Sequence, residues 1–284
     1  MARFSLVVAT IERATELDKL LASLASQTFS DFEVILVDQN QDDRVKVIAK
    51  PWTEIITIRH LRSEKGLSRA RNRGLAEAKG EIIAFPDDDC WYGINTLQQV
   101  NDWFLSHKEF DFLSTCAMNE THKLTANRWL NRSSEISRRN VFRSCISISL
   151  FFRQSAIRAV DGFDEFIGVG SGSKFGSGED TDYVLRILQL GHRGWFEASF
   201  AIFHPDPKPD VSPAAQSRAR SYGLGFGYVQ RMHKMPFLIF VYLCMRPAAG
   251  WLLNFARGRK SSGVYLATLR GRLAGYFHPA GISR

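Results

Sequence analysis

Three consecutive aspartates, Asp87, Asp88 and Asp89, directly follow the apolar run Ile82–Phe85. Neighbouring carboxylates repel one another, so such a cluster is usually retained where a cation compensates its charge. In an extended backbone Asp87 and Asp89 project to one side and Asp88 to the other. Two carboxylates would then share one divalent ion, Mg²⁺ or Mn²⁺, which leaves positions open for phosphate oxygens, while the third faces a ribose hydroxyl. The alternatives are an acidic surface turn or a helix N-cap.

A second acidic cluster, Glu179, Asp180 and Asp182, follows a segment (168–178) that holds five glycines and three serines. This composition predicts a mobile loop, and the acids stand at the start of a helix predicted from Glu179 to Leu190. Acids at a helix N-terminus meet its dipole favourably, and capping is the preferred interpretation for Asp182. For Glu179 and Asp180 the loop indicates an element that closes over a substrate, where one carboxylate takes a proton from a hydroxyl group.

The elements that must position these acids alternate between short apolar runs and amphipathic segments. Leucines at helical spacing separate the first runs, which indicates strand–helix–strand units and a parallel sheet covered on both faces. The predicted strands are Phe4–Ala9, Glu33–Val37, Ile55–Ile58, Ile82–Phe85, Phe110–Cys116 and Val141–Phe152.

Ligands of such sheets bind beyond the carboxyl ends of the strands. The segments predicted to line that edge are Thr10 to Arg13, Asp38 to Gln41, His60 to Gly66 and Asp87 to Asp89. A proline-rich segment, residues 204–213, then predicts a boundary. We therefore expect two domains, a catalytic α/β domain over residues 1–204 and a basic, amphipathic helical region over residues 205–284.

The net charge of +8 is concentrated in the C-terminal region. Residues 205–284 hold twelve Lys or Arg and two Asp, so the rest of the chain is slightly acidic. Local basic charge beside apolar residues favours a membrane surface over nucleic acid as the partner. The four cysteines lie far apart and show no CxxC pair, which is typical of reduced, intracellular thiols.

Two apolar stretches, 235–245 and 248–256, are separated by Arg246 and Pro247. Neither reaches the roughly 20 residues that span a bilayer, and an arginine between them would be costly in lipid. The pattern favours helices that lie in the membrane interface. The alternative is a helical hairpin buried against the main domain.

Several stretches, in this order, resemble the family 2 glycosyltransferases, the large inverting group with the GT-A fold. They span about residues 3 to 204 and read SLVVAT, LASLASQTFSDFEVILVDQN, GLSRARNRGLAEAKGEIIAFPDDD, FFRQSAIRAVDGFDE, IGVGSG and GEDTDYVLRILQLG. The resemblance implies a GT-A fold, with a mainly parallel, Rossmann-like sheet covered by helices, followed here by a membrane-associating C-terminal appendage.

The resemblance also implies roles for single residues. Asp89, with Asp87 or Asp88, matches the motif that binds the metal and the diphosphate. Asp180 matches the general base, and Glu179 beside it matches an acceptor contact.

Five further positions carry expectations. Thr10 and Asp38 match positions that line the nucleoside pocket, and His204 lies where relatives often carry a histidine near the metal. Gln39 stands where the family usually has a second acid, and its amide can donate and accept hydrogen bonds to a base. Arg71 is expected either to steady phosphate or to lie with its neighbours on a solvated helix face.

The function that follows is metal-dependent, inverting transfer of a sugar from a nucleotide-diphosphate donor to a saccharide acceptor. The resemblance implies surface polysaccharide synthesis on a lipid-linked acceptor, at the inner, cytoplasmic face of the cell membrane. A sugar nucleotidyltransferase is the rival enzyme, but it normally needs a Gly- and Arg/Lys-rich loop after the first strand, where this chain reads TIERATE. An inactive nucleotide-sugar-binding module is the remaining alternative.

Overall fold

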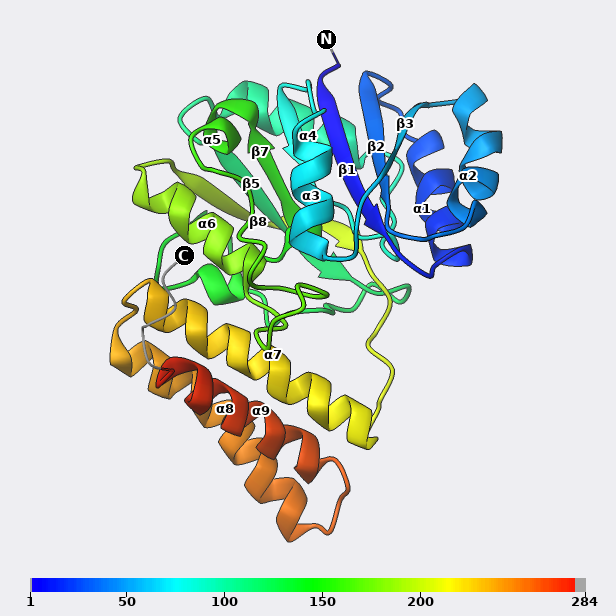
Figure 1. Ribbon diagram of the computed structural model, residues 1–284. Coiled ribbons are helices and arrows are strands. Elements are labelled where there is room, and N and C mark those ends of the chain that lie inside the picture. The colour runs from blue at the N-terminus through cyan, green and yellow to red at the C-terminus, as the bar shows by residue number, and fades with distance from the viewer. Residues whose placement is uncertain (1, 279–284) are drawn as a thin grey trace. The chain divides into compact units, whose positions relative to one another are not determined.

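A computed structural model describes residues 2–278, which divide into two compact units (Figure 1). In the described part of the chain, the first unit comprises residues 2–65, 69–163 and 183–207. The second comprises residues 66–68, 164–182 and 208–278. The division after residue 207 is near the predicted boundary at 204. The acidic loop 164–182, however, groups with the C-terminal helices.

Within the described residues the first unit is built on one sheet with eight strands. The strands are β1 (Phe4–Thr10), β2 (Phe32–Asp38), β3 (Thr57–Arg62), β4 (Ile82–Ala84), β5 (Phe112–Met118), β6 (Ser134–Glu135), β7 (Leu150–Arg153) and β8 (Gly194–Phe203). Their spatial order is β3-β2-β1-β4-β7-β5-β8-β6. The pairs β1–β2, β2–β3, β1–β4 and β5–β8 are parallel, whereas β7 runs antiparallel between β4 and β5.

Helices connect the strands and continue into the second unit. They are α1 (Thr15–Ala25), α2 (Arg44–Ala49), α3 (Leu67–Leu75), α4 (Thr96–Ser106), α5 (Gln154–Arg158), α6 (Glu179–Gln189), α7 (Pro213–Met232), α8 (Phe237–Ala256) and α9 (Ser262–Tyr276). Short 3₁₀ turns are η1 (Lys50–Glu54), η2 (Val141–Arg143) and η3 (Ser147–Ser149). The mainly parallel sheet covered by helices confirms the predicted fold class.

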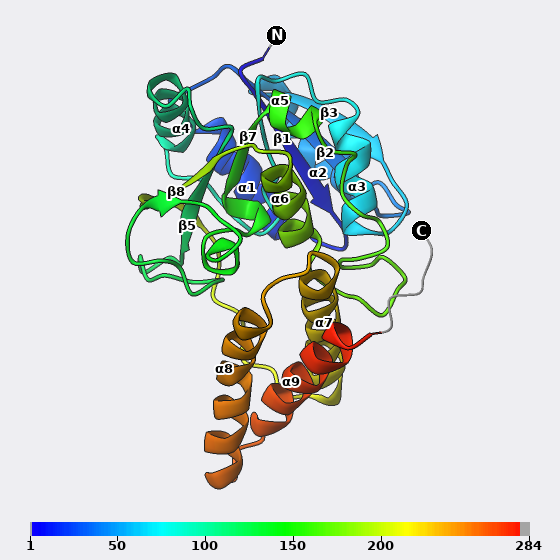
Figure 2. The same ribbon diagram turned by 90° about the vertical axis from the view of Figure 1, so that its left-hand side faces the viewer.

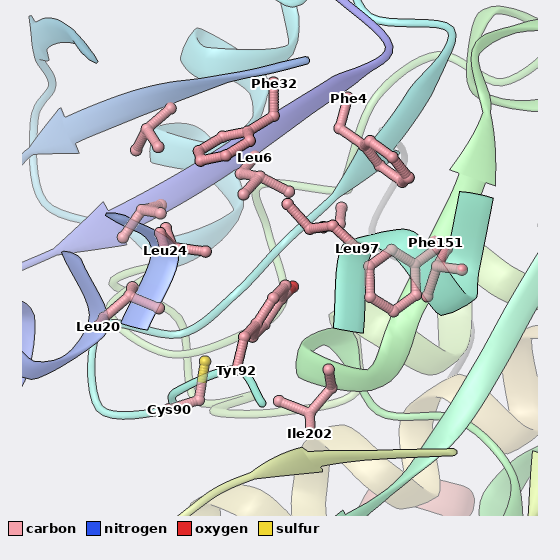
Figure 3. Close-up of a cluster of buried hydrophobic side chains, with 14 of the residues drawn as sticks. Phe4, Leu6, Leu20, Leu24, Phe32, Cys90, Tyr92, Leu97, Phe151 and Ile202 are labelled. Carbon is pink, nitrogen blue, oxygen red and sulfur yellow. The ribbon is translucent and has the colours of Figure 1, made fainter. Parts of the chain in front are cut away.

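Helices cover both faces of the sheet (Figure 2). The leucines of α1 and the apolar side chains of α4 pack on one face, in a core that includes Phe4, Leu6, Leu97 and Phe151 (Figure 3). On the other face α3 approaches β1 and β2 so closely that a side chain at Gly74 would meet Val7. Burial of these apolar side chains is the main stabilising contribution to the sheet.

The strand predictions are confirmed at four of six segments, with bounds that shift by at most two residues. The prediction of a strand over Val141–Phe152 is wrong except at its end, because only β7 is extended. Polar side chains there turn back on the local backbone: Ser149 donates to the carbonyl of Ile146, and Ser144 donates to that of Asn140. Such bonds compete with a strand ladder. The prediction over Ile55–Ile58 also missed most of β3, because the edge strand is at most partly buried and four of its six residues are polar or charged.

In the second unit, α7 and α9 pack backbone against backbone. A side chain at Gly227 would lie 2.1 Å from the carbonyl oxygen of Arg272, and one at Gly275 would lie 2.1 Å from that of Leu224. Glycine at both positions is therefore required for this approach. The ring of Phe240 in α8 stacks on that of Tyr276 in α9, with centroids 4.0 Å apart, which attaches the third helix.

The expectation of two interrupted apolar segments is wrong, because α8 is one helix of 20 residues that includes Arg246 and Pro247. A proline lacks the N–H that would bond the carbonyl four residues earlier. Here that carbonyl belongs to Leu243, and the guanidinium of Arg272 in α9 donates a hydrogen bond to it. This contact replaces the missing helical bond and lets the helix continue.

Candidate active site

The carboxyl ends of the first strands bring together residues that are far apart in the sequence. In the parallel register Thr10 lies opposite Asp38, and Asp38 lies opposite Arg62. Thr10, Asp38 and the following Gln39 are buried. The edge that topology assigns to ligands is thus lined by three of the residues predicted to form the nucleoside pocket.

Asp38 is held by protein groups on several sides. Its carboxylate accepts hydrogen bonds from the backbone and side chain of Asn40 at 2.8 Å, and lies 2.8 Å from Nη1 of Arg62 and 3.0 Å from Nε2 of His60. A fully buried carboxylate needs such compensation. The carboxylate is therefore fixed in one orientation at the edge of the sheet.

The three aspartates follow β4 at the same edge, and Arg13 from the β1–α1 loop bridges two of them. Nη1 of Arg13 lies 2.7 Å from Oδ1 of Asp88 and 2.6 Å from Oδ2 of Asp89. Asp88 is the most buried of the three side chains and Asp87 the most exposed. The guanidinium of Arg13 therefore compensates part of the negative charge of the three aspartates.

The environment moves the pKa values of neighbouring aspartates in opposite directions. Burial raises the pKa of Asp88 from 3.8 to about 6, although the charge of Arg13 acts against it. Burial also acts to raise the pKa of Asp89, but a hydrogen bond from His204 and the charge of Arg13 outweigh it, and that pKa is lowered. Two adjacent carboxyl groups therefore differ in how readily they ionise.

Arg71 in α3 is buried, which excludes the solvated helix face expected as one alternative. Its Nη2 lies 3.2 Å from Oδ1 of Asp87 and donates to the hydroxyl of Ser147 at 2.7 Å. The rings of Phe85 and Phe163 flank the guanidinium. Because an arginine stays charged, this arrangement places a fixed cation beside the aspartates.

His204, at the end of β8, lies beside Asp89, with 3.5 Å between Nε2 and Oδ1. Burial lowers the pKa of His204, but the hydrogen bond and charge of Asp89 outweigh it and the pKa is raised. Within residues 2–278 no group of three or more His, Cys, Asp or Glu is placed to hold a metal ion by itself. The pair of Asp89 and His204 nevertheless fits a Mg²⁺ or Mn²⁺ ion, because such ions usually take one or two protein ligands and complete their shell with phosphate oxygens and water.

Glu179 and Asp180 belong to the second unit, in the first turn of α6. Glu179 is buried, and Gly168 adopts a positive φ of 106° close to its carboxyl group, where an added side chain would lie 3.0 Å from it. Asp182, which the sequence assigned to capping, is fully buried and lies 2.8 Å from Nε2 of His233. The helix predicted over Glu179–Leu190 is confirmed.

Five residues that contact the predicted side chains had no role assigned from the sequence: Arg13, Asn40, His60, Arg62 and Ser147. The signal for the first four was their position, since all four fall within segments predicted to line the carboxyl edge. Ser147 carried no signal, because it lies in a stretch predicted as a strand and reaches Arg71 only through the fold.

The structure is thus a mainly parallel α/β sheet with acids and cations gathered at its carboxyl edge, where α/β sheets bind their ligands. Residues 5–157 match the family model described as glycosyl transferase family 2. Because this match covers more than half of the chain, the protein belongs to that family and is a glycosyltransferase.

Curated relatives agree with this assignment. Glycosyltransferase AglE of Haloferax volcanii is 26% identical over 80% of this chain and 73% of its own length. GalNAc(5)-diNAcBac-PP-undecaprenol beta-1,3-glucosyltransferase of Campylobacter jejuni is 27% identical over 59% of this chain, a match that spans 57% of that relative.

Solved structures share the fold. TarS residues 1–349 of S. aureus in complex with UDP-GlcNAc aligns with a TM-score of 0.64 and 17% identity, over 98% of this chain and 93% of that one. The mannosyltransferase PcManGT of Pyrobaculum calidifontis, in complex with GDP-Man and Mn²⁺, aligns with a TM-score of 0.64 and 14% identity, over 97% of this chain and 87% of that one.

Proposed function

We propose that this glycosyltransferase moves a sugar from a nucleoside diphosphate to a saccharide acceptor, with inversion and with a divalent metal. The observation that carries the proposal is the gathering of Asp87, Asp88 and Asp89 with two arginines and His204 at the carboxyl edge of the sheet. Alternating acids and cations suit a ligand that brings both a metal ion and phosphates.

In the proposed site Asp89 and His204 hold the metal ion, with Asp87 as the further carboxylate predicted for it. The bound Mg²⁺ or Mn²⁺ would stabilise negative charge on the departing diphosphate. Arg71 lies beside Asp87, where its fixed charge steadies a phosphate group. Arg13 compensates Asp88 and Asp89 before the ion and the donor bind.

The nucleoside lies at the neighbouring strand ends in this proposal. Thr10, Asp38 and Gln39 line its pocket, and Asp38 accepts hydrogen bonds from a base or ribose in an orientation fixed by His60 and Arg62. Asp88 faces the ribose. Because the Asp38 side chain is already held in this orientation, less conformational entropy is lost when the nucleoside binds.

Asp180 is the proposed general base. It takes the proton from the acceptor hydroxyl as that oxygen forms its bond to the anomeric carbon and the bond to the diphosphate breaks on the opposite side. One displacement of this kind inverts the anomeric configuration. Glu179 is the proposed acceptor contact.

A thermal-stabilisation screen tests donor binding. Purified protein is heated with a panel of nucleotide sugars, each with Mn²⁺ and with EDTA. A donor that binds the folded protein raises its melting temperature, and the metal should be required for the full effect. Asp89→Asn should lose the metal-dependent part, whereas the exposed Asp102→Asn in α4 should keep it. Equal stabilisation in EDTA would contradict the metal dependence.

We also propose that the acceptor is lipid-linked and that α8 attaches the protein peripherally to the inner face of the cell membrane. Within the described residues α8 alone is long and apolar enough to cross a membrane, and only 17% of it is buried. Its exposed side carries Leu238, Met245, Leu252 and Phe255, each more than half exposed. Single exposed apolar residues are ordinary, but a contiguous row marks an interaction surface.

Two features favour a position in the membrane interface over a span. Arg246 is exposed midway along α8, and the opposite side of the helix packs on α9 through Phe240 and Tyr276. Residues 208–278 also contain eleven Lys or Arg and one Asp, a charge that complements anionic lipid. The Campylobacter relative is named for transfer to an undecaprenol-linked glycan, which supports a similar acceptor here.

A further inference from the structure

A buried, hydrogen-bonded pair of an aspartate and a histidine lies in the second unit, outside the residues to which the proposed reaction assigns a role. Asp182 in the first turn of α6 and His233, which follows the last residue of α7, approach to 2.8 Å between Oδ1 and Nε2. The side chains are 0% and 5% exposed. An ionised carboxylate only accepts, so His233 donates through Nε2.

The pair belongs to a turn that also carries the two acids of the proposed reaction. Glu179 and Asp180 lie three and two residues before Asp182, and the backbone N–H of Asp182 donates to the carbonyl of Gly178 at 2.8 Å. Fixing Asp182 therefore fixes the first turn of α6. The direction of the Asp180 side chain, two residues earlier, follows from the position of that turn.

The loop before this turn rests on α7, the helix that His233 ends. Gly176 N–H donates to the carbonyl of Ser221, and the Ser177 hydroxyl donates to that of Tyr222 at 2.8 Å. The loop runs so close to α7 that a side chain at Gly225 would lie 1.9 Å from the carbonyl oxygen of Ser177. Helix α7 thus contacts the acidic loop at several positions. The bond between Asp182 and His233 is the contact at the C-terminal end of α7.

We propose that His233 is a positioning residue for the reaction: its bond to Asp182 holds the turn that presents Asp180 and Glu179. This inference rests on the proposed function. Consequently the C-terminal helices do more than attach the protein to a surface, because one of them supports the acids. A turn released from His233 would still carry both carboxylates, but in a wider range of orientations.

Two amide substitutions separate positioning from mere stability. In His233→Gln the amide nitrogen reaches the place of Nε2 and can donate to Asp182, whereas in His233→Asn the amide is too short. We expect His233→Asn to lower kcat about tenfold to a hundredfold, with the donor KM changed little. His233→Gln should restore most of kcat. Gln230→Ala, also buried in α7 but without a bond to Asp182, is the matched control and should keep its kcat even if its melting temperature falls.

Hydrogen exchange of residues 176–186 gives a readout that needs no turnover. His233→Asn should speed exchange in this segment, whereas His233→Gln and Gln230→Ala should leave it close to that of the wild type. The proposal is overturned if His233→Asn keeps full kcat and slow exchange, or if Gln230→Ala loses kcat equally. Absence of transfer by the wild type with every donor would instead refute the proposed function, while the exchange result would still decide the role of His233 in holding the turn.

Discussion

At the scale of single residues, Asp88 and Asp89 should respond to pH in opposite ways. The pKa of Asp88 in the folded protein is about 6, above its ordinary 3.8, so ionising this carboxyl costs stability. This loss of folding free energy is absent below pH 3.8, grows between pH 3.8 and about 6, and is complete above pH 6 or so. Asp88→Asn should therefore raise the free energy of unfolding by about 3 kcal/mol at pH 8, and by little at pH 4.

Asp89→Asn is the matched variant with the opposite expected sign. Its pKa is lowered in the folded protein, so the charged form contributes stability above the ordinary pKa and loses it as pH falls through the folded value. The substitution should destabilise at pH 8, and the loss should shrink toward acid pH. Denaturant unfolding of both variants in EDTA buffer measures the two profiles. If both substitutions changed the free energy of unfolding in the same direction at pH 8, the environments that we assign to Asp88 and Asp89 would be wrong.

Arg13 should compete with a metal ion for the same carboxylates. Its guanidinium bridges Asp88 and Asp89, and a divalent ion at Asp89 must weaken that contact. In the absence of nucleotide, Arg13→Gln should therefore bind Mn²⁺ more tightly than the wild type, by about tenfold. Titration calorimetry with Mn²⁺ alone gives this result, and Arg44→Gln, which lies in an exposed pair with Asp42, is the control. Weaker binding in Arg13→Gln would show that the arginine does not compete.

At the scale of elements, Gly225 in α7 makes the closest contact with the acidic loop. A methyl group there would lie 1.9 Å from the Ser177 carbonyl, which is backbone and must shift. Gly225→Ala should cost about 1–3 kcal/mol of stability and reduce turnover, because the loop that carries the acids is displaced. Thermal unfolding and kcat measure both effects.

Gly263→Ala in α9 provides the comparison. Its added methyl would meet only the end of the flexible Gln216 side chain, at 3.0 Å. Alanine also favours a helix by about 1 kcal/mol over glycine, so this variant should be neutral or stabilised. Equal losses in the two variants would indicate that the contact of Gly225 with the loop has no special role.

Elements also show how far the sequence could predict this protein. Strands β1, β2 and β4 and helix α1 were predictable because their apolar residues form continuous runs in the strands and recur at helical spacing in the helix, and most of them are buried. Of the other parallel strands, most of β3 was missed and β8 was not predicted, since both are only partly buried. The stretch 141–152 was not, because serine side chains bond their own backbone and overrule an apolar pattern. Helix α8 was split wrongly at Pro247, since only the fold shows that Arg272 replaces the lost bond.

The same limit applies to the site. Acids that follow a strand could be placed at the carboxyl edge from sequence, and so could Thr10 and Asp38. The partners that fix the site residues could not, because Ser147 reaches Arg71 and His233 reaches Asp182 from segments that are distant in the chain. Sequence spacing carries no information about such contacts unless the topology is known.

At the scale of the whole molecule, attachment to anionic lipid can be tested without removing α8 and α9. Deleting residues 235–284 would also strip α7 of the helix that packs on it, and α7 supports the acidic loop. Single substitutions on the exposed side of α8 avoid this difficulty. Leu252→Glu and Phe255→Glu should each reduce flotation with vesicles of phosphatidylglycerol and phosphatidylcholine, since each replaces an apolar contact by a repelled charge.

Val47→Glu is the matched control for this experiment, because Val47 is 69% exposed on α2, in the first unit, and has no part in the proposed lipid-binding side of α8. It should float like the wild type. Vesicles of phosphatidylcholine alone should bind less than the anionic ones, and added salt should reduce the difference. If the α8 variants float as well as Val47→Glu, this surface does not attach the protein to lipid.

The central claim is that the aspartates after β4 serve metal-dependent release of a nucleoside diphosphate from a sugar donor. The most direct measurement is that release from a panel of nucleotide sugars, with acceptor lipid extract, in Mn²⁺ and in EDTA. We predict release with one donor class in Mn²⁺, its loss in EDTA, a fall of about a hundredfold or more in Asp89→Asn, and normal release by Asp102→Asn. Full release by Asp89→Asn, or equal release in EDTA, would contradict the account.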